Sequence, residues 1–151
     1  MRITTRGRYA LRASLALAKL GKEGEPISIN SLSEEENISS VFLEQIFFKL
    51  RKAGIVNSVR GPGGGFCFAH PLEKLTVKEI LDAAGEDLSV SSCDKHIDEC
   101  GRIGGCISHR VWVSVTDLVN DYLRGLTLAS LLGSREPLVK NEIPQNEIPQ
   151  Q

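Results

Sequence analysis

The sequence predicts a mainly α-helical fold with one small β-hairpin and a long helix towards the C-terminus. Three observations predict it. Apolar residues recur at helical spacing, a glycine-rich turn separates two short β-like runs, and a long apolar helix follows that unit. With 151 residues, 41% hydrophobic and 25% charged, the composition is that of a globular chain able to bury a core.

The first half of the chain predicts three helices. A helix from Arg6 to Leu20 stops at Gly21, a β-like piece surrounds Ile27, and a short helix runs from about Asn30 to Glu36. A third helix has Ser39 or Ser40 as its N-cap and ends at Gly54. Its buried stripe has the spacing i, i+3, i+4 and i+7 and consists of Leu43, Ile46, Phe47 and Leu50. Two helices joined by a tight turn are typical of a helix-turn-helix.

A β-hairpin follows directly, with strands at residues 55–60 and 66–68 and a turn at residues 61–65. The turn lacks the Gly-Lys-Ser/Thr ending of a P-loop and leads into a strand, which argues against nucleotide binding. A hairpin after a helix-turn-helix is a wing. Residues 1–71 are therefore predicted to form a winged helix-turn-helix domain that binds DNA.

Charge supports this assignment. Residues 1–71 hold 10 lysines and arginines against 6 acidic residues, whereas residues 72–151 hold 8 against 13. The third helix would enter the major groove, and the wing and basic residues would contact the backbone and minor groove. The predicted DNA-binding residues are Arg2, Ser39, Ser40, Val41, Glu44, Gln45, Lys49, Arg51, Lys52, Arg60, Gly61, Pro62 and Gly63.

Residues 72–133 are predicted to hold further helices and a cysteine-rich loop. Thr76 caps a short helix with Glu79 at the capping-box position, and Thr127 lies near the cap of a last short helix. Between them, a helix from about Ile107 to Leu123 carries an apolar face made of Val111, Val115, Leu118, Val119 and Tyr122. Such a helix is typical of dimerisation, which an inverted-repeat DNA site requires. Residues 134–151 repeat Asn-Glu-Ile-Pro-Gln and are predicted to be a disordered tail.

The stretch "CDKHIDECGRIGGCISH", residues 93–109, holds three of the four cysteines and two of the three histidines. A disulfide framework, a zinc site, an iron–sulfur cluster and bare redox-active thiols are the alternatives. The basic N-terminus has no signal-peptide core and no apolar run is long enough for a membrane, so we expect a cytoplasmic protein, where structural disulfides are rare. Zinc sites favour short Cys-x2–4-Cys hooks, whereas only Cys106 and His109 are that close, so the spacing favours a cluster. His96 is a rival fourth ligand, and Cys67 is interpreted as a free thiol in a strand.

Several motifs together resemble a known family. "MRITTRGRYALRA", "FLEQIFFKLRKAGIVNSVRGPGGGF", the three-cysteine loop and the H-x-x-W helix resemble the IscR-like iron–sulfur cluster regulators. These winged-helix repressors also include the nitric-oxide sensor NsrR. The resemblance covers about residues 1–133. It implies a homodimeric transcriptional regulator, mainly a repressor, that senses iron–sulfur cluster, iron or redox status through a [2Fe–2S] cluster.

By that resemblance the cluster ligands are Cys93, Cys100, Cys106 and His109. Their spacing is C-x6-C-x5-C-x2-H, and the first interval is one residue longer than the IscR pattern. NsrR-like proteins use an aspartate of the first helix as a ligand, but Arg8 stands at the matching position, which favours the IscR-like set.

The alternatives are a zinc-structured repressor, a nitric-oxide sensor with a [4Fe–4S] cluster and, from another class, an iron–sulfur electron carrier. A carrier needs neither a helix-turn-helix nor a wing. No Ser/His/Asp order or pair of catalytic carboxylates is evident in the sequence, so an enzyme is not expected.

Overall fold

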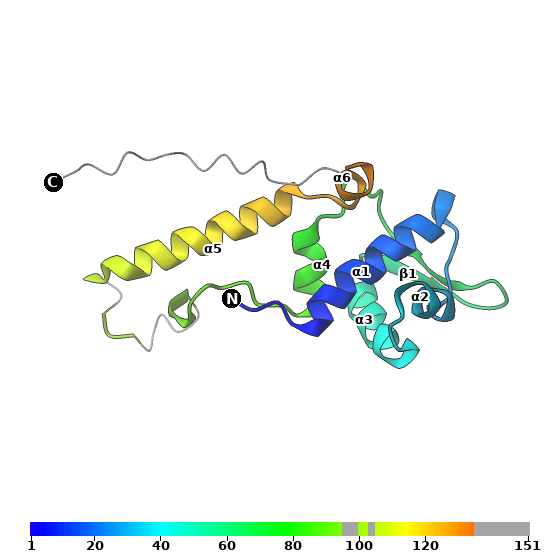
Figure 1. Ribbon diagram of the computed structural model, residues 1–151, viewed down its shortest axis with the longest axis horizontal. Helices are drawn as coiled ribbons and strands as arrows, with labels where there is room; N and C mark the ends of the chain where they lie inside the picture. Colours follow the sequence, from blue (N-terminus) through cyan, green and yellow to red (C-terminus); the bar gives the residue numbers. More distant parts are fainter. Residues whose placement is uncertain (95–99, 103–104, 135–151) are drawn as a thin grey trace.

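The computed structural model describes residues 1–94, 100–102 and 105–134 (Figure 1). Four helices form the main body: α1 (Thr5–Leu20), α2 (Ile29–Glu36), α3 (Ser40–Lys52) and α4 (Val77–Ala84). A 3₁₀ turn, η1 (Lys22–Gly24), follows α1. The mainly helical prediction is confirmed, and each predicted helix is present with ends shifted by one or two residues.

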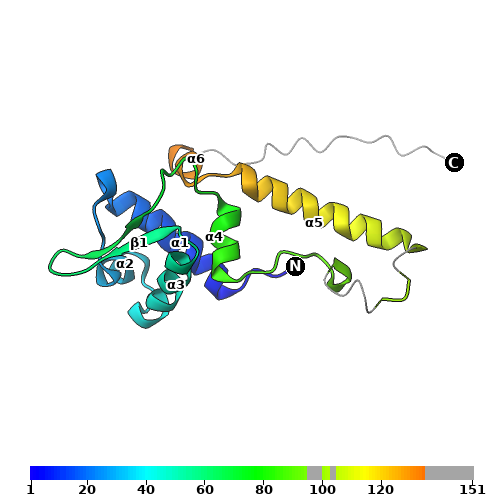
Figure 2. The same cartoon turned by 180° about the vertical axis from the view of Figure 1, so that it is seen from behind.

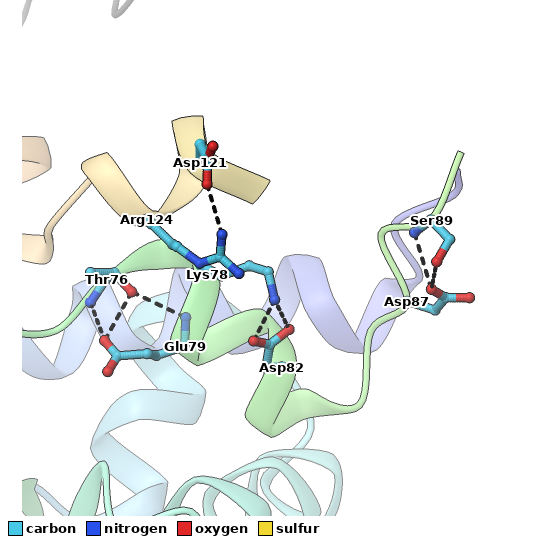
Figure 3. A network of polar contacts seen from close by, with 8 residues as sticks. All are labelled: Thr76, Lys78, Glu79, Asp82, Asp87, Ser89, Asp121 and Arg124. Carbon is cyan, nitrogen blue, oxygen red and sulfur yellow. Dashed lines mark hydrogen bonds and ion pairs between the residues drawn. The ribbon is translucent and has the colours of Figure 1, made fainter. Parts of the chain in front are cut away.

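Side-chain oxygens begin the helices of the body. Thr4 accepts a hydrogen bond from the Gly7 backbone N–H, Ser28 caps α2 and Ser39 caps α3. The predicted capping box of α4 is present, since Thr76 and Glu79 exchange side-chain to backbone hydrogen bonds (Figure 3).

The core lies where these helices meet. All four residues of the predicted α3 stripe are buried: Leu43, Ile46, Phe47 and Leu50. They pack in one cluster with Leu17 of α1, Leu32 of α2 and Ile80 of α4. Because one face of α3 is buried in this core, the opposite face of α3 can contact solvent or a ligand.

The wing is a two-stranded antiparallel hairpin of β1 (Val56–Val59) and β2 (Gly65–Phe68), in which Val56 pairs with Phe68 and Val59 with Gly65. The expected β-like piece is a bridge from Ile27 to Phe66. Gly65 has φ +152°, and a Cβ there would lie 2.1 Å from the carbonyl oxygen of Ile27. Only glycine permits this close approach, so it fixes where the second strand begins.

Two further helices follow in the described residues, α5 (Ile107–Gly125) and α6 (Leu128–Gly133), and the 3₁₀ turn η2 (Ser92–Asp94) lies between α4 and α5. The C-terminal end of α5 is anchored at the start of α4, because the N–H of Val77 donates to Leu126 O at 2.8 Å and the N–H of Leu128 donates to Leu75 O at 2.9 Å. From this anchor α5 extends away from the body, as both views show (Figures 1 and 2).

An ion pair between Arg124 and Asp121, at 2.7 Å, lies near the anchored end of α5 (Figure 3). Within the ranges that the structure covers, no helix has the length and apolar character to cross a bilayer. The predicted disordered tail lies outside the described residues, apart from Ser134.

Candidate nucleic-acid interface and metal centre

The solvent face of α3 brings together most of the residues that the sequence assigned to DNA. Glu44, Gln45 and Lys52 are exposed, as are the apolar side chains of Val41 and Phe48. These side chains line an open groove of about 800 Å³ between α3 and α4. Ala83 of α4 lines the side of the groove opposite α3. Ser39 and Ser40 lie at the N-terminal end of the same helix.

Basic side chains surround this face. Lys49, Arg51 and Lys52 occupy the last turn of α3. The Lys49 Nζ and an Arg6 guanidinium nitrogen converge beside Gly85, where an added Cβ would lie 3.4 Å and 3.8 Å from them. A second hollow of about 730 Å³ lies next to them and includes Arg2, Arg6 and Arg8 of the N-terminal segment. Two adjacent cationic hollows of this kind suit a phosphate backbone.

Side-chain contacts hold the wing against α3. The ring of Phe66 in β2 packs against that of Phe47 at a centroid distance of 4.9 Å. On the outer side, the Arg51 guanidinium donates to the Ser58 hydroxyl of β1 at 3.3 Å and lies 5.7 Å from the centre of the Phe48 ring. The wing tip with Arg60, Gly61, Pro62 and Gly63 is exposed beyond this contact.

Glu86 is a structural residue that the sequence analysis missed. Its carboxylate accepts hydrogen bonds from the backbone N–H of Thr4 at 2.8 Å and of Gly7 at 3.1 Å, and it also contacts the Thr4 hydroxyl. Burial raises the pKa of Glu86, but the bonds from Thr4 and Gly7 and the charge of Arg6 together lower it. No local pattern signals this contact, because about 80 residues separate the partners along the chain.

The segment around η2 and the N-terminal end of α5, which carry candidate cluster ligands, lie at the end of the molecule away from the wing (Figure 1). Cys93 belongs to η2 and is half-buried, Cys100 is exposed, and Cys106 is the N-cap residue of α5. His109 follows in the first turn of α5. A hollow of about 560 Å³ adjoins Cys106 and is also lined by Gly101, Arg102 and Gly105.

The polar atoms of this end have the chemistry that a metal centre needs. His109 Nδ1 is buried and has no hydrogen-bond partner among the described residues. The Cys106 Sγ lies 3.1 Å from the Ser108 hydroxyl. That hydrogen bond, together with one from the His109 backbone, lowers the pKa of the Cys106 thiol and favours the thiolate that binds metal.

These ligands are not assembled around a point. Over the described ranges, no three His, Cys, Asp or Glu side chains converge as a metal site would require. All four cysteines are free, which argues against the disulfide alternative. Cys67 is a half-buried thiol in β2, as expected, and His96 lies outside the described residues. Three thiols and an imidazole are a donor set that an iron–sulfur group accepts, although the described side chains do not surround one point.

Comparison with known proteins identifies the architecture. The chain is 36% identical over 138 residues to the transcriptional regulator IscR of Pectobacterium atrosepticum. The matched region is 91% of this chain and 83% of the relative. Among solved structures, IscR of T. potens superposes with a TM-score of 0.71 at 30% identity, covering 90% of this chain and 89% of that one. CymR, the global cysteine regulator of B. subtilis, superposes with a TM-score of 0.72 at 29% identity, covering 88% of this chain and 97% of that one.

These neighbours are winged-helix regulators, which confirms the predicted fold class and the IscR-like resemblance. The relatives are regulators of transcription and not enzymes, so this chain is not expected to catalyse a reaction. Residues 3–134 match the family model Rrf2, described as an iron-dependent transcriptional regulator. The chain thus belongs to the Rrf2 family of DNA-binding transcriptional regulators.

Proposed function

We propose that this regulator, mainly a repressor, binds an inverted-repeat operator as a homodimer and senses iron–sulfur cluster, iron or redox status through a [2Fe–2S] cluster held by Cys93, Cys100, Cys106 and His109. Residues 1–71 read the DNA, and residues 72–133 hold the cluster loop and the dimer helix. The observation that carries the proposal is the buried Nδ1 of His109, which lacks a partner among the described residues and lies one helical turn after a thiol with a lowered pKa.

When bound, the group supplies a redox-sensitive and oxygen-sensitive centre, in which a neutral imidazole in place of a thiolate raises the reduction potential. The residues of the chain would hold and orient this group. Cys106 and His109 are fixed by the first turn of α5, whereas Cys93 and Cys100 belong to the segment before it. Binding the second pair to the same group as the first would fix the position of η2 relative to α5.

Contacts around Val90 supply a route from this connection to the DNA-binding body. The N–H of Val90 donates to the Thr116 hydroxyl of α5 at 3.1 Å, and the Val90 carbonyl accepts from the N-terminal amino group at 3.5 Å. Four residues earlier, Glu86 holds the start of α1. A displacement of the cysteine segment would therefore shift the start of α1 and the arginines beside it.

The homodimer is supported by α5. Ile107, Val111 and Leu118 are 79%, 50% and 69% exposed, and Tyr122 continues the same face. Thr116 is the one α5 residue, of those described, that the single chain buries. An apolar helix face of this length, left uncovered within one chain, suits a second copy of the chain.

The cluster is tested by anaerobic purification with a visible spectrum and an iron and sulfide assay. Alanine at Cys93, Cys100 or Cys106 should abolish the visible absorbance without unfolding the body, and Cys67→Ala is the matched control that should keep it. His109→Ala should leave a labile or altered spectrum, and His109→Cys should restore a cluster. Colourless protein with bound zinc would favour the zinc-structured repressor, and an unchanged His109→Ala spectrum would move the fourth ligand to His96 or an acidic residue.

The DNA-binding assignment is tested by the salt dependence of binding. Lys52→Ala should weaken all sequences alike and flatten the salt slope by about one unit, because one phosphate contact is lost. Arg60→Ala should cost about 1–3 kcal/mol, mainly on sites with a narrow A·T minor groove. Equal losses for Arg60→Ala on random DNA would contradict the placement of the wing.

A further inference from the structure

Two apolar side chains are exposed on the proposed DNA-facing side of α3. Val41 is 64% exposed and Phe48 is 57% exposed, and both lie outside the buried core that Leu43, Ile46, Phe47 and Leu50 form on the other side of the helix. Exposed apolar side chains are common singly, but two that share a groove with charged residues indicate a recognition surface.

We infer that Val41 and Phe48 recognise the 5-methyl groups of thymines in the major groove, and so set a sequence preference of the operator. The inference rests on the proposed DNA-binding role of α3 and deepens it. The thymine methyl is the apolar group that the major groove presents, and apolar side chains are its usual partners.

The spacing on α3 suits two such contacts. Val41 and Phe48 are seven residues apart, two turns of one helix face, which is about 10 Å along the axis at 1.5 Å per residue. A base pair rises about 3.4 Å, so the two side chains reach thymines about three steps apart. Glu44 and Gln45 lie between them and would address the intervening base edges.

Charge argues that the occupant of this groove is DNA and not a protein partner. Lys49 and Lys52 line the same groove as Val41 and Phe48, and the Arg6 guanidinium lies beside Lys49. The apolar pair is therefore bordered by cations, which matches a methyl-bearing groove between two phosphate backbones.

Phe48 is also held in place for such a contact. The Arg51 guanidinium lies 5.7 Å from its ring centre, and Arg51 is itself tied to Ser58 of the wing. This restricts the ring before DNA arrives, so less side-chain freedom is lost on binding.

The experiment starts from operators selected from random duplexes with the full-length protein. Each thymine of a half-site is then replaced by deoxyuridine, which lacks only the methyl group. Deoxyuridine at one or two of the thymines should weaken wild-type binding about three- to fivefold. This factor corresponds to the loss of about 0.8 kcal/mol for one buried methyl-sized group. Val41→Ser and Phe48→Ser should each bind thymine and uracil equally at one of these positions, whereas Val41→Thr, which keeps a methyl group, should retain the discrimination.

Controls separate this inference from the proposed function. Leu20→Ser removes an exposed apolar side chain at the far end of α1 and should leave thymine discrimination intact. Lys52→Ala should weaken every operator but keep the thymine-to-uracil ratio. Specific binding without any methyl dependence would overturn the inference and leave the regulator intact, whereas failure to select any operator would overturn the proposed function. A changed oligomeric state in Phe48→Ser with unchanged DNA binding would assign the groove to a second copy and also overturn it.

Discussion

At the scale of single residues, the contact between Gly7 and Glu86 decides how α1 begins. A Cβ on Gly7 would lie 2.5 Å from Cγ of Glu86, so the glycine makes room for the carboxylate that caps the helix. Gly7→Ala should destabilise the protein by about 1 kcal/mol, since overpacking outweighs the helix propensity of alanine. In a Glu86→Ala background the clash is gone, and the same substitution should stabilise by about 1 kcal/mol. Denaturant unfolding of the four proteins measures the reversal, and equal effects in both backgrounds would contradict it.

The same carboxylate makes stability depend on pH. The pKa of Glu86 is lower in the folded chain than its ordinary value, so the ionised form stabilises the fold above the ordinary pKa. That contribution is lost as the pH falls from the ordinary glutamate pKa through the lowered folded value. Unfolding free energies measured from pH 6 downwards should fall less steeply for Glu86→Gln than for the wild type, and parallel curves would show that Glu86 is not the group responsible.

At the scale of elements, α5 leaves an apolar face uncovered by the described part of the chain, and we propose that a second copy covers it. Leu118 is 69% exposed on the face that also carries Val111 and Tyr122. Leu118→Lys places a charge in the proposed dimer interface and should raise the dimer dissociation constant at least tenfold, which corresponds to about 1.4 kcal/mol. Asp117→Lys introduces the same lysine one position earlier and is the matched control. Sedimentation or light scattering over a concentration series reads the outcome, and a wild-type monomer would exclude this interface.

Features within single helices and the wing were also those that the sequence predicted best. The α3 stripe, the capping box at Thr76 and Glu79 and the glycine turn of the wing are local patterns, because the residues that define each one lie close together in the sequence. The grip of Glu86 on α1 and the groove between α3 and Ala83 of α4 could not be predicted, because they depend on how distant segments pack. The candidate ligands were recognisable by residue type, but the sequence could not predict that their side chains would not converge.

At the scale of the whole molecule, the proposed sensing function requires that the cysteine end of the molecule influence its DNA-binding end. The segment between α4 and η2 is held at two points, because the Val90 N–H donates to the Thr116 hydroxyl of α5 and Glu86 accepts from the Thr4 N–H at the start of α1. We propose that these contacts couple α5 to α1, and through α1 to the DNA-binding body. A ligand can shift such a system only by binding its two arrangements with different affinity. Glu44 is the proposed reader of that shift, because a carboxylate in the groove must meet a cytosine donor or be repelled by nearby phosphates.

Cluster occupancy should therefore change the affinity for at least one class of operator by about 5- to 150-fold, the usual range of allosteric coupling. Holo-protein, apo-protein and Cys93→Ala are titrated anaerobically against selected operators, and apo-protein should match Cys93→Ala. Glu44→Ala should shrink the dependence by letting cluster-free protein bind the sensitive sites. Glu86→Ala should shrink it by a different route, because it removes the grip on α1 without touching the groove. Equal affinities of holo-protein, apo-protein and Cys93→Ala on every operator would leave the cluster a structural role only.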